Sequence, residues 1–461
     1  MTSAETIPQR ELDRDLRLII LDGLATEAMT TLTGGAFLVA FALLLGATNF
    51  QIGLLASLPT FTNLFQILSI WLVRRYGSRR QVSVICSLLA RTPLLIIGSI
   101  PFLFPASAGI RTVIAFLFCF YFFGSIAGPS WNAWMKDLIP EKMLGSYFSR
   151  RSRYSQLLNV GLSLLLALSL EYARRYHPGT ELKAYAGMFL LAGLAGIMGA
   201  LVLGKVTEPV SEVSRGSIFG LMWRAVQDAN FRRLLVFNSA WVFALNIATP
   251  FFNVFLMKSL GLTIAYIIPL TILSQLSSIL TIRFWGIFAD RYSNKTILAI
   301  CTPLYLACLI AWCFVGIYTT QVSNLILLVL IHLASGASTS GVNLAMTNIG
   351  LKLAPRNEAI VYLSTKSIFT SLFSALAPLI GGYLADFFTH RHFRIIAEFA
   401  GPHLHKTFRL LILHEWNFLF LIGAFLAVGA IQLLAQIKET GEVGRGIVVR
   451  IMRSSIRNNL K

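Results

Sequence analysis

Charged residues are scarce in this chain. Of its 461 residues, 13% are charged and 56% are hydrophobic, and the mean hydropathy is +0.70. A soluble protein carries about 25% charged residues. So few charges cannot cover a water-facing surface of this size, which excludes a soluble globular protein. The composition predicts that most of the surface faces lipid.

Cysteine is also scarce, and no catalytic or ligand-binding motif is present. The five cysteines lie inside apolar runs without metal-like spacing to histidine, which predicts free buried thiols and no disulfide framework. A phosphate-cradling glycine loop, a metal-ligand cluster and a nucleophile elbow are all missing from the sequence. We therefore predict that the protein is not an enzyme and has neither a cofactor nor a bound metal.

Long apolar runs dominate what is present. Twelve of them are long enough to cross about 30 Å of hydrocarbon. The first follows a polar N-terminal segment and has no small-residue cleavage site after it, which predicts a true span and no signal peptide. The spans are predicted at 20–45, 51–72, 82–103, 111–132, 154–170, 185–204, 234–257, 262–284, 296–317, 323–349, 362–385 and 416–436.

Basic residues follow the alternation of these spans. The net charge is +19, which by itself would suggest a nucleic-acid partner. With the N-terminus inside, 29 of the 39 Lys and Arg residues fall on cytoplasmic segments and nine on outer segments, while Arg91 lies within a span. The positive-inside rule explains this excess and predicts both termini in the cytoplasm. We therefore expect no nucleic-acid partner.

The chain contains an internal repeat. Residues 129–153 and 345–368 resemble each other, and further landmarks keep nearly the same spacing along the chain. A repeat of this length in an apolar chain indicates a duplicated membrane bundle. At an offset of 215 the pairs are Pro140 with Pro355, Tyr147 with Tyr362 and Gly46 with Gly261; Gly77 pairs with Ser293, one residue longer.

The repeat divides the chain into four parts. Residues 1–204 and 234–436 are predicted to form two six-helix bundles, joined by a cytoplasmic connector at 205–233 and followed by a basic cytoplasmic tail at 437–461. An apolar and basic stretch, 218–224, predicts a short helix on the inner leaflet. The tail either forms a similar surface helix or frays.

One outer loop, 387–415, is unusually long and contains five of the seven histidines. Two β-prone runs flank a Gly-Pro turn, which predicts a small hairpin. Two His-x-His pairs are typical of some metal sites, but no cysteine or paired carboxylate joins them. We therefore predict no metal here.

A ten-residue segment, 286–295, carries a family resemblance. Its sequence GIFADRYSNK resembles G-x-L-A-D-R-x-G-R-K, the signature loop of the major facilitator superfamily. The first-half copy departs more, since Arg74 replaces the acidic residue. Residues 131–153 resemble a loop of poorly characterised bacterial members. The resemblance implies an all-α membrane protein with twelve helices in two pseudo-symmetric bundles, located in the bacterial inner membrane, that transports a small molecule.

The signature predicts a conformational latch. Asp290, with Gly286 and Arg291 beside it, would meet the positively charged start of span five, where Arg150, Arg151 and Arg153 lie. At the symmetry-related place, Arg74 would pair with Glu358. The alternative is that all these residues merely mark cytoplasmic loops.

The first predicted span carries Asp22 and Glu27, and the third carries Arg91. A charge in hydrocarbon is costly and calls for a partner or a function. Glu27 lies about 10 Å and Arg91 about 13 Å from the cytoplasmic ends of their spans, so we predict that they pair and that Glu27 couples transport to protons. The alternatives are a static ion pair, and an Asp22 that sits at the water interface.

In the family, spans one, four, seven and ten line the central cavity. Their polar and aromatic residues here suit a neutral or amphipathic organic solute better than a multiply charged anion, although small polar residues also serve helix packing. The candidate cavity residues are Asn238, Trp241, Asn246, Asn253, Ser335, Thr339, Asn343 and Tyr121.

The leading hypothesis is a proton-coupled secondary transporter of a small organic solute that works by alternating access. A typical drug–proton antiporter is not favoured, since span four lacks an internal arginine and span five lacks a proline. The alternatives are an uncoupled facilitator, and a non-transporting sensor or assembly factor that uses the outer hairpin and the basic tail.

Overall fold

The computed structural model describes residues 8–103, 106–209, 218–316, 321–355, 359–391, 393–401, 404–413 and 415–439. Within these ranges, twelve helical segments are long and apolar enough to cross a membrane. Their number and order agree with the twelve predicted spans, and most extend further at their ends. Contacts divide the chain into two compact units, Met1–Gly216 with Leu256–Ile268, and Ser217–Phe255 with Pro269–Lys461.

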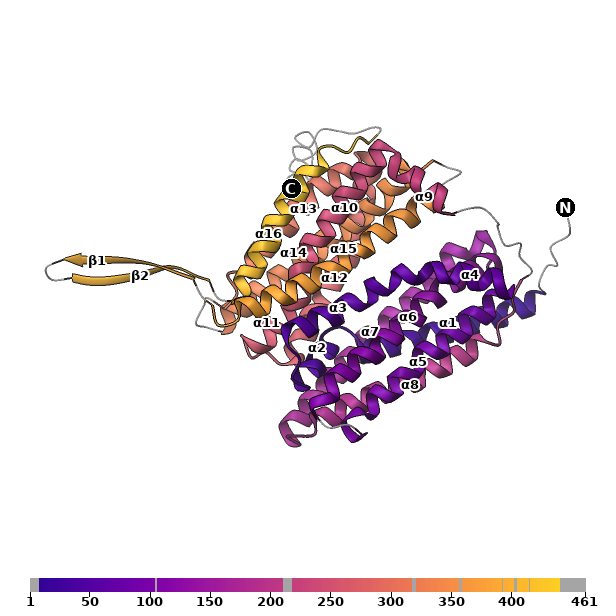
Figure 1. The fold of residues 1–461 in the computed structure, drawn as a ribbon, viewed down its shortest axis with the longest axis horizontal. Coiled ribbons are helices and arrows are strands. Elements are labelled where there is room, and N and C mark those ends of the chain that lie inside the picture. Colours follow the sequence, from indigo (N-terminus) through magenta and orange to yellow (C-terminus); the bar gives the residue numbers. More distant parts are fainter. Residues whose placement is uncertain are drawn as a thin grey trace, which may run out of the picture. The chain divides into compact units, whose positions relative to one another are not determined.

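The first unit contains six spans, shown in indigo to magenta in Figure 1. Its first span is broken where Gly35 adopts a positive φ of 56°, and its second contains a short 3₁₀ turn. The helices are α1 (Gln9–Thr33), α2 (Gly35–Leu44), α3 (Asn49–Thr62), η1 (Asn63–Gln66), α4 (Ile67–Tyr76), α5 (Arg79–Leu103), α6 (Ala106–Leu138), α7 (Glu141–Tyr176) and α8 (Glu181–Leu203).

The second unit repeats this plan after a short connector helix, α9 (Ile218–Gln227). This helix covers the stretch predicted at 218–224. The others are α10 (Ala229–Ala248), η2 (Thr249–Phe251), α11 (Phe252–Lys258), α12 (Ile264–Arg291), α13 (Asn294–Trp312), α14 (Gln321–Leu353), α15 (Ala359–Phe388) and α16 (Glu415–Leu434).

Corresponding turns of the repeat have the same backbone geometry. Gly46 follows the first span of the first half of the repeat and Gly261 follows the first span of the second half, and their φ values are 76° and 64°. Side chains rarely adopt such values, which explains glycine at both places. The equivalence of Gly77 and Ser293 is wrong, however. Ser78 and Ser293 cap the helices that begin at the next residue, so the offset remains 215.

Helices approach closely where small residues lie between them. A Cβ added at Gly193 would meet Leu95 Cδ2 of α5 at 2.6 Å, and one added at Gly98 would meet the carbonyl oxygen of Ala186 at 2.8 Å. In the second unit, a Cβ at Gly336 of α14 would overlap the backbone of Ser274 in α12. In lipid, burial of apolar side chains does not by itself hold helices together. Small residues at these contacts let the helices pack closely enough to associate.

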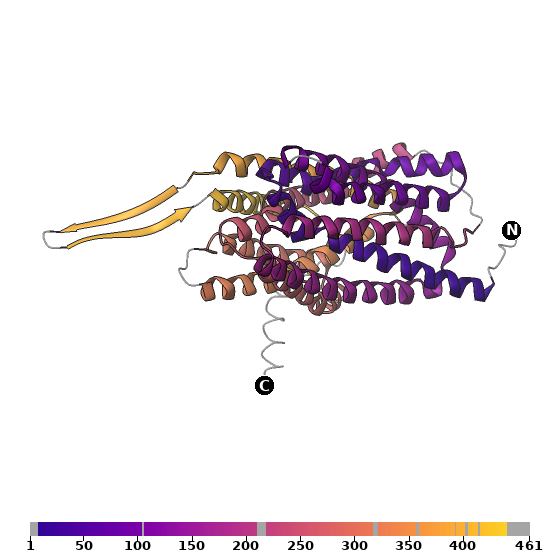
Figure 2. The same ribbon diagram turned by 90° about the horizontal axis from the view of Figure 1, so that it is seen from below.

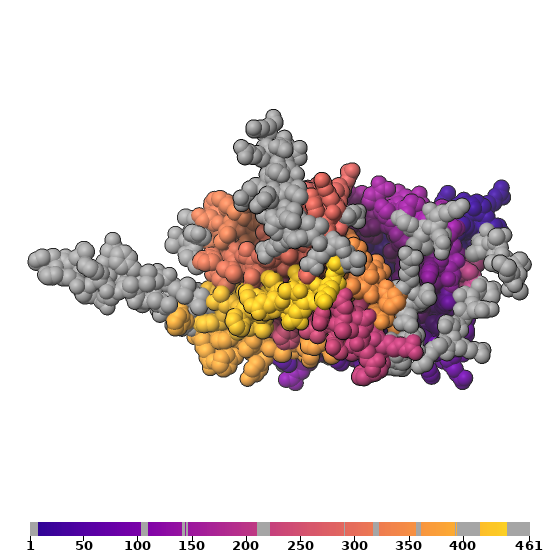
Figure 3. All heavy atoms as spheres, turned by 90° about the horizontal axis from the view of Figure 1, so that it is seen from above, coloured from indigo at the N-terminus to yellow at the C-terminus, as the bar shows by residue number. Residues whose placement is uncertain are grey.

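Large apolar side chains remain exposed on the outer helices. Leu168, Leu280 and Phe425 are 68%, 78% and 78% exposed. Phe425 belongs to α16, which Figure 3 shows in yellow along one face of the second unit. Exposed apolar residues on helices of this length are typical of surfaces that face lipid.

A two-stranded hairpin joins α15 to α16. Strands β1 (Phe393–Gly401) and β2 (Leu404–Leu413) pair antiparallel from Phe393 opposite Leu413 to Gly401 opposite Leu404, with an irregularity between Ile395 and Ile396. Figure 2 shows both strands extending away from the helices of their unit. The predicted hairpin in loop 387–415 is confirmed.

Candidate functional site

Each unit contains polar cavities among its helices. The first cavity lies in the first unit, measures about 460 Å³ and is lined by residues of α1, α3, η1, α5, α6, α7 and α8. The second and third cavities lie in the second unit and measure about 600 and 260 Å³. Those two share Thr249 and Tyr305 as lining residues.

A buried ion pair lies on the wall of the first cavity. Asp22 Oδ1 lies 3.3 Å from Arg91 Nη2, and the two residues are 3% and 6% exposed. Arg91 also donates to Thr26 Oγ1 at 3.0 Å and to the carbonyl oxygen of Gly196 in α8. The pair therefore joins α1, α5 and α8, and its charges compensate each other out of water.

The predicted pairing of Glu27 with Arg91 is wrong. Glu27 Oε1 accepts a hydrogen bond from Asn159 Nδ2 of α7 at 3.1 Å, and Asn159 also donates to Thr31 Oγ1 at 2.9 Å. Asp22 and Glu27 are five residues apart, so they point about 140° apart around the helix axis. Glu27 and Arg91 have similar predicted depths in the membrane, which suggests that they pair. The structure instead pairs Arg91 with Asp22, which lies on a different face of α1 from Glu27. Asp22 is buried among the helices.

The first cavity also contains an arginine that the sequence predicts in the latch. Arg151 of α7 lies against Gly23, and its guanidinium stacks 5.0 Å from the ring centre of Trp131. Its Nε is buried without a hydrogen-bond partner among the described residues, as are Trp131 Nε1 and Ser83 Oγ. All three residues line the cavity together with Tyr121. Three buried polar atoms of residues that line this cavity thus have no hydrogen-bond partner among the described residues.

The second cavity brings together residues from α10, α13, α14 and α15. Asn238 donates to Thr370 Oγ1, and Asn246 donates to Ser374 Oγ at 3.1 Å. Five of the predicted cavity residues line this space, namely Asn238, Trp241, Asn246, Thr339 and Asn343.

Lys366 is a cavity residue that sequence reasoning misses. The charge count assigns it to the cytoplasmic segment 350–366, but it lies in the membrane-spanning part of α15 and lines the second cavity. Its Nζ donates to the carbonyl oxygen of Met346 at 2.5 Å. The repeat could have identified it, because Lys366 stands 215 residues after Arg151.

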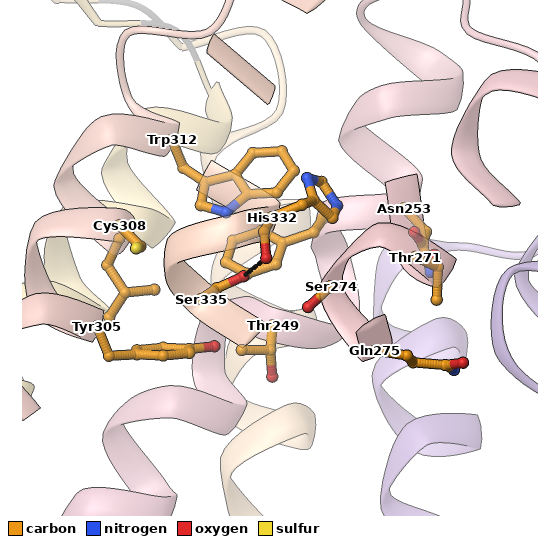
Figure 4. A pocket seen from close by; sticks show the side chains of 12 residues that line it. Thr249, Asn253, Thr271, Ser274, Gln275, Tyr305, Cys308, Trp312, His332 and Ser335 are labelled. Carbon is orange, nitrogen blue, oxygen red and sulfur yellow. Dashed lines mark hydrogen bonds between the residues drawn. The ribbon is translucent and has the colours of Figure 1, made fainter. Parts of the chain in front are cut away.

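The third cavity has a polar and an aromatic side, as Figure 4 shows. Trp312 stacks on Phe252 at 4.2 Å between ring centres, and His332 lies 5.8 Å from the Trp312 ring. The ring nitrogen Nδ1 of His332 is 2.7 Å from the carbonyl oxygen of Leu328. The predicted cavity residues Asn253 and Ser335 line this space. Sequence reasoning does not single out His332.

The latch candidates are partly described. Arg150 and Arg153 are exposed on α7, and Arg74 is exposed on the last turn of α4. Arg291 lies 5.5 Å from the ring centre of Tyr292, and a Cβ at Gly286 would meet nothing within 4 Å. The side chain of Asp290, and Glu358 altogether, lie outside the described part of the structure.

Comparison with known proteins decides the family. The model of the Major Facilitator Superfamily matches residues 23–359 and 234–442. The chain belongs to this superfamily. It is therefore an integral membrane protein with a transporter fold, and the fold class predicted from the sequence is confirmed. A comparison with curated protein sequences finds no significant match.

Solved structures of superfamily transporters share the fold. The nucleoside transporter NupG superposes with a TM-score of 0.66 at 14% identity over 92% of this chain and 98% of NupG. A D-xylose–proton symporter gives 0.62 at 13% identity over 94% and 100% of the two chains. A bacterial homologue of the human lysosomal transporter Spinster gives 0.58 at 17% identity over 82% of each chain. At these identities the likeness shows the fold alone.

These neighbours and the family are transporters, not enzymes. The twelve-helix superfamily fold moves a small molecule across the membrane by alternating access of two bundles. Membership of this superfamily therefore supports secondary transport as the activity of this chain.

Proposed function

We propose that this protein is a proton-coupled secondary transporter of a small organic solute. It would operate in the bacterial cytoplasmic membrane with both termini inside, as the distribution of basic residues favours. The solute would contact the polar and aromatic residues of the three cavities. The observation that carries the proton coupling is the buried Asp22–Arg91 pair on the wall of the first cavity.

The geometry of this pair suits proton exchange. Asp22 borders the cavity, so its carboxylate can gain a proton from water there, while Arg91 keeps its charge. Protonation removes one of the two compensating charges and leaves Arg91 buried with only neutral acceptors. The packing of α1 against α5 and α8 would then change in stability. Proton binding is thereby linked to the arrangement of three helices in one unit.

Glu27 is the second candidate for coupling. Its contact with Asn159 links α1 to α7 on the other face of the helix. Asn159 is neutral, so protonation of Glu27 changes a hydrogen bond but leaves no uncompensated charge behind. Asp22 is therefore a better candidate for proton coupling than Glu27, which is predicted from its depth in the membrane.

A latch between the two units completes the proposal. The signature loop with Asp290 would pair with Arg150 or Arg153, both of which are exposed at the start of span five. Arg151 lies in the first cavity against the ring of Trp131 and is therefore the poorest of the three partners for the latch. Arg74 would pair with Glu358 at the symmetry-related place.

The coupling is tested with purified protein in liposomes. Uptake of radiolabelled uridine, xylose and benzoate is measured with and without an imposed proton gradient, and proton movement is followed with a trapped pH dye. Accumulation of a probe that requires the gradient supports the proposal. In Asp22→Asn we expect accumulation to fall to the equilibrium level while exchange of probe across the membrane continues.

Glu27→Gln is the matched control. If it abolishes accumulation and Asp22→Asn does not, the coupling residue is Glu27. Wild-type flux that ignores the gradient would instead indicate an uncoupled facilitator. Absence of any flux from folded protein would favour the sensor or assembly factor.

A further inference from the structure

Arg151 and Lys366 occupy the same position in the two units. They are 215 residues apart, the offset that also relates Tyr147 to Tyr362. Each lies on the fifth span of its unit, α7 or α15, and each lines a polar cavity. Their contacts correspond as well. Arg151 stacks on Trp131, and Lys366 donates to the carbonyl oxygen of Met346, which is 215 residues after Trp131.

Both cavities carry an excess of one positive charge. In the first, Asp22 compensates Arg91, and Arg151 remains as the additional cation among the described lining residues. In the second, Lys366 is the charged residue among those that the structure describes, with amides, hydroxyls and apolar groups around it. A cation in a membrane-spanning segment is costly unless an anion or strong acceptors compensate it.

The two cations have unused hydrogen-bond donors. Arg151 Nε is buried without a partner among the described residues, and Trp131 Nε1 beside it is in the same state. An ammonium group has three donors, and the hydrogen bond from Lys366 Nζ to Met346 uses one of them. Donors without acceptors beside a cation fit an oxyanion, whose oxygens only accept hydrogen bonds.

Aromatic residues line both cavities together with the cations. Tyr121 and Trp131 line the first cavity with Arg151, and Trp241 and Tyr305 line the second with Lys366. Such rings provide flat apolar surface for an aromatic or apolar group. One excess cation in each cavity suits one negative charge there better than several.

From this symmetry we infer that the solute is an organic monoanion, a carboxylate attached to an aromatic or apolar body, and that Arg151 and Lys366 recognise its charge. The inference rests on the proposed transport function and names its substrate class. It also explains why a repeat that has diverged at most positions retains a cation at this one.

The test uses acid and amide pairs that differ in charge but hardly in shape. Benzoate with benzamide, and indole-3-acetate with indole-3-acetamide, are titrated at pH 7 into the purified full-length protein, and the shift of the melting temperature gives the dissociation constant. We expect the carboxylates to raise the melting temperature and the amides to have little effect. Lys366→Met and Arg151→Met should each weaken carboxylate binding about tenfold to a hundredfold.

Conservative and matched variants keep the test interpretable if a methionine variant folds poorly. Lys366→Arg and Arg151→Lys retain the charge and should retain most of the preference for acids. Trp131→Phe keeps the ring but removes the unpartnered donor, and we expect it to weaken carboxylate binding less than Arg151→Met. Lys183→Met and Arg17→Met remove exposed charges elsewhere and should leave binding unchanged.

Several results would overturn the inference. They are amides that bind as well as acids, no shift with any carboxylate, an equal shift with chloride alone, or tighter binding of phenyl phosphate than of benzoate. If amides bind and also cross the membrane of the liposomes, the transport function stands without anion recognition. If carboxylates bind through Lys366 but no probe crosses, anion recognition stands and the transport function fails.

Discussion

Ser78 and Ser293 cap the same helix of the repeat in the two units. The Oγ of Ser78 accepts a hydrogen bond from the backbone N–H of Gln81 at 3.1 Å, and that of Ser293 accepts one from Thr296 at 3.1 Å. A serine at this position satisfies a backbone donor that the first turn of a helix leaves free. The loops between the second and third spans of the two units are therefore built alike, although their signature residues differ.

An acidic residue from the end of each unit completes this cap. Glu208 accepts hydrogen bonds from the backbone N–H of Arg79 and from Ser78 Oγ, and Glu439 accepts from the backbone N–H of Lys295 at 2.7 Å. Each glutamate thereby ties the chain after the sixth span of its unit to the start of the third. A carboxylate is also favourable at the positive end of a helix.

The first prediction concerns the acid stability of the second unit. Burial raises the pKa of Glu439, but hydrogen bonds from Lys295, Asn294 and Lys352 outweigh it, and the pKa is lowered from its ordinary value of 4.5. A carboxylate with a lowered pKa stabilises the fold above its ordinary pKa, and this stabilisation is lost as pH falls through the folded pKa. We expect Glu439→Gln to destabilise the protein by about 2 kcal/mol at pH 7.

The pH dependence separates this charge effect from a loss of packing. The difference in melting temperature between wild type and Glu439→Gln should shrink as the pH is lowered from about 5 to about 3, because the stabilisation is lost as the pH falls from 4.5 through the lowered pKa of the folded protein. A difference that stays constant over this range would show that the charge of Glu439 does not stabilise the fold.

The second prediction concerns the buried pair in the first unit. Removing one partner leaves the other as an uncompensated buried charge, so Asp22→Asn and Arg91→Met should each destabilise the protein by about 3–5 kcal/mol. The double variant Asp22→Asn/Arg91→Met should recover much of that loss, because no charge remains unpaired. Denaturation of all four proteins in the same detergent measures this coupling. Losses that simply add in the double variant would mean that the two charges do not stabilise each other.

The third prediction concerns the close approach of α12 and α14. A Cβ at Gly336 would overlap the backbone of Ser274, which cannot rotate away as a side chain can. Gly336→Ala should therefore destabilise the protein by roughly 1–3 kcal/mol, although alanine favours a helix. Gly429→Ala on α16 is the matched control, since its Cβ would meet nothing within 4 Å. Equal melting temperatures for the two variants would contradict this contact.

The sequence predicts the helices better than it predicts their contacts. Twelve apolar runs and a repeat suffice for the spans and the two units, because the length of a span is set by the thickness of the membrane. Which side chains contact each other also depends on the face of the helix on which each one lies. The depth of a residue in the membrane does not give this. Asp22 and Glu27 show this, since the neighbours of each are decided by the face of α1 on which it lies.

Lys366 shows a second reason for the difference. A lysine near the cytoplasmic end of a span resembles the basic residues that flank spans, and charge counting assigns it to the loop. The helix α15 begins at Ala359, seven residues earlier, which places Lys366 about 10 Å along the helix. Lys366 aligns with Arg151 when the offset of 215 is applied to every residue of the repeat and not only to its most similar positions.

The last prediction concerns the hairpin between α15 and α16. The strands extend away from the helices of their unit, and Phe393 and Leu413 are paired at their base. Paired residues of antiparallel strands are about 5 Å apart at Cα, so a short Gly-Ser linker can replace residues 393–413 without moving either helix. We expect the shortened protein to melt within a few degrees of wild type and to transport at an unchanged rate in liposomes. The outcome also separates two functions, because a folded variant that transports normally leaves the hairpin free for a partner outside the transport cycle. Loss of flux at an unchanged melting temperature would instead place the hairpin in that cycle.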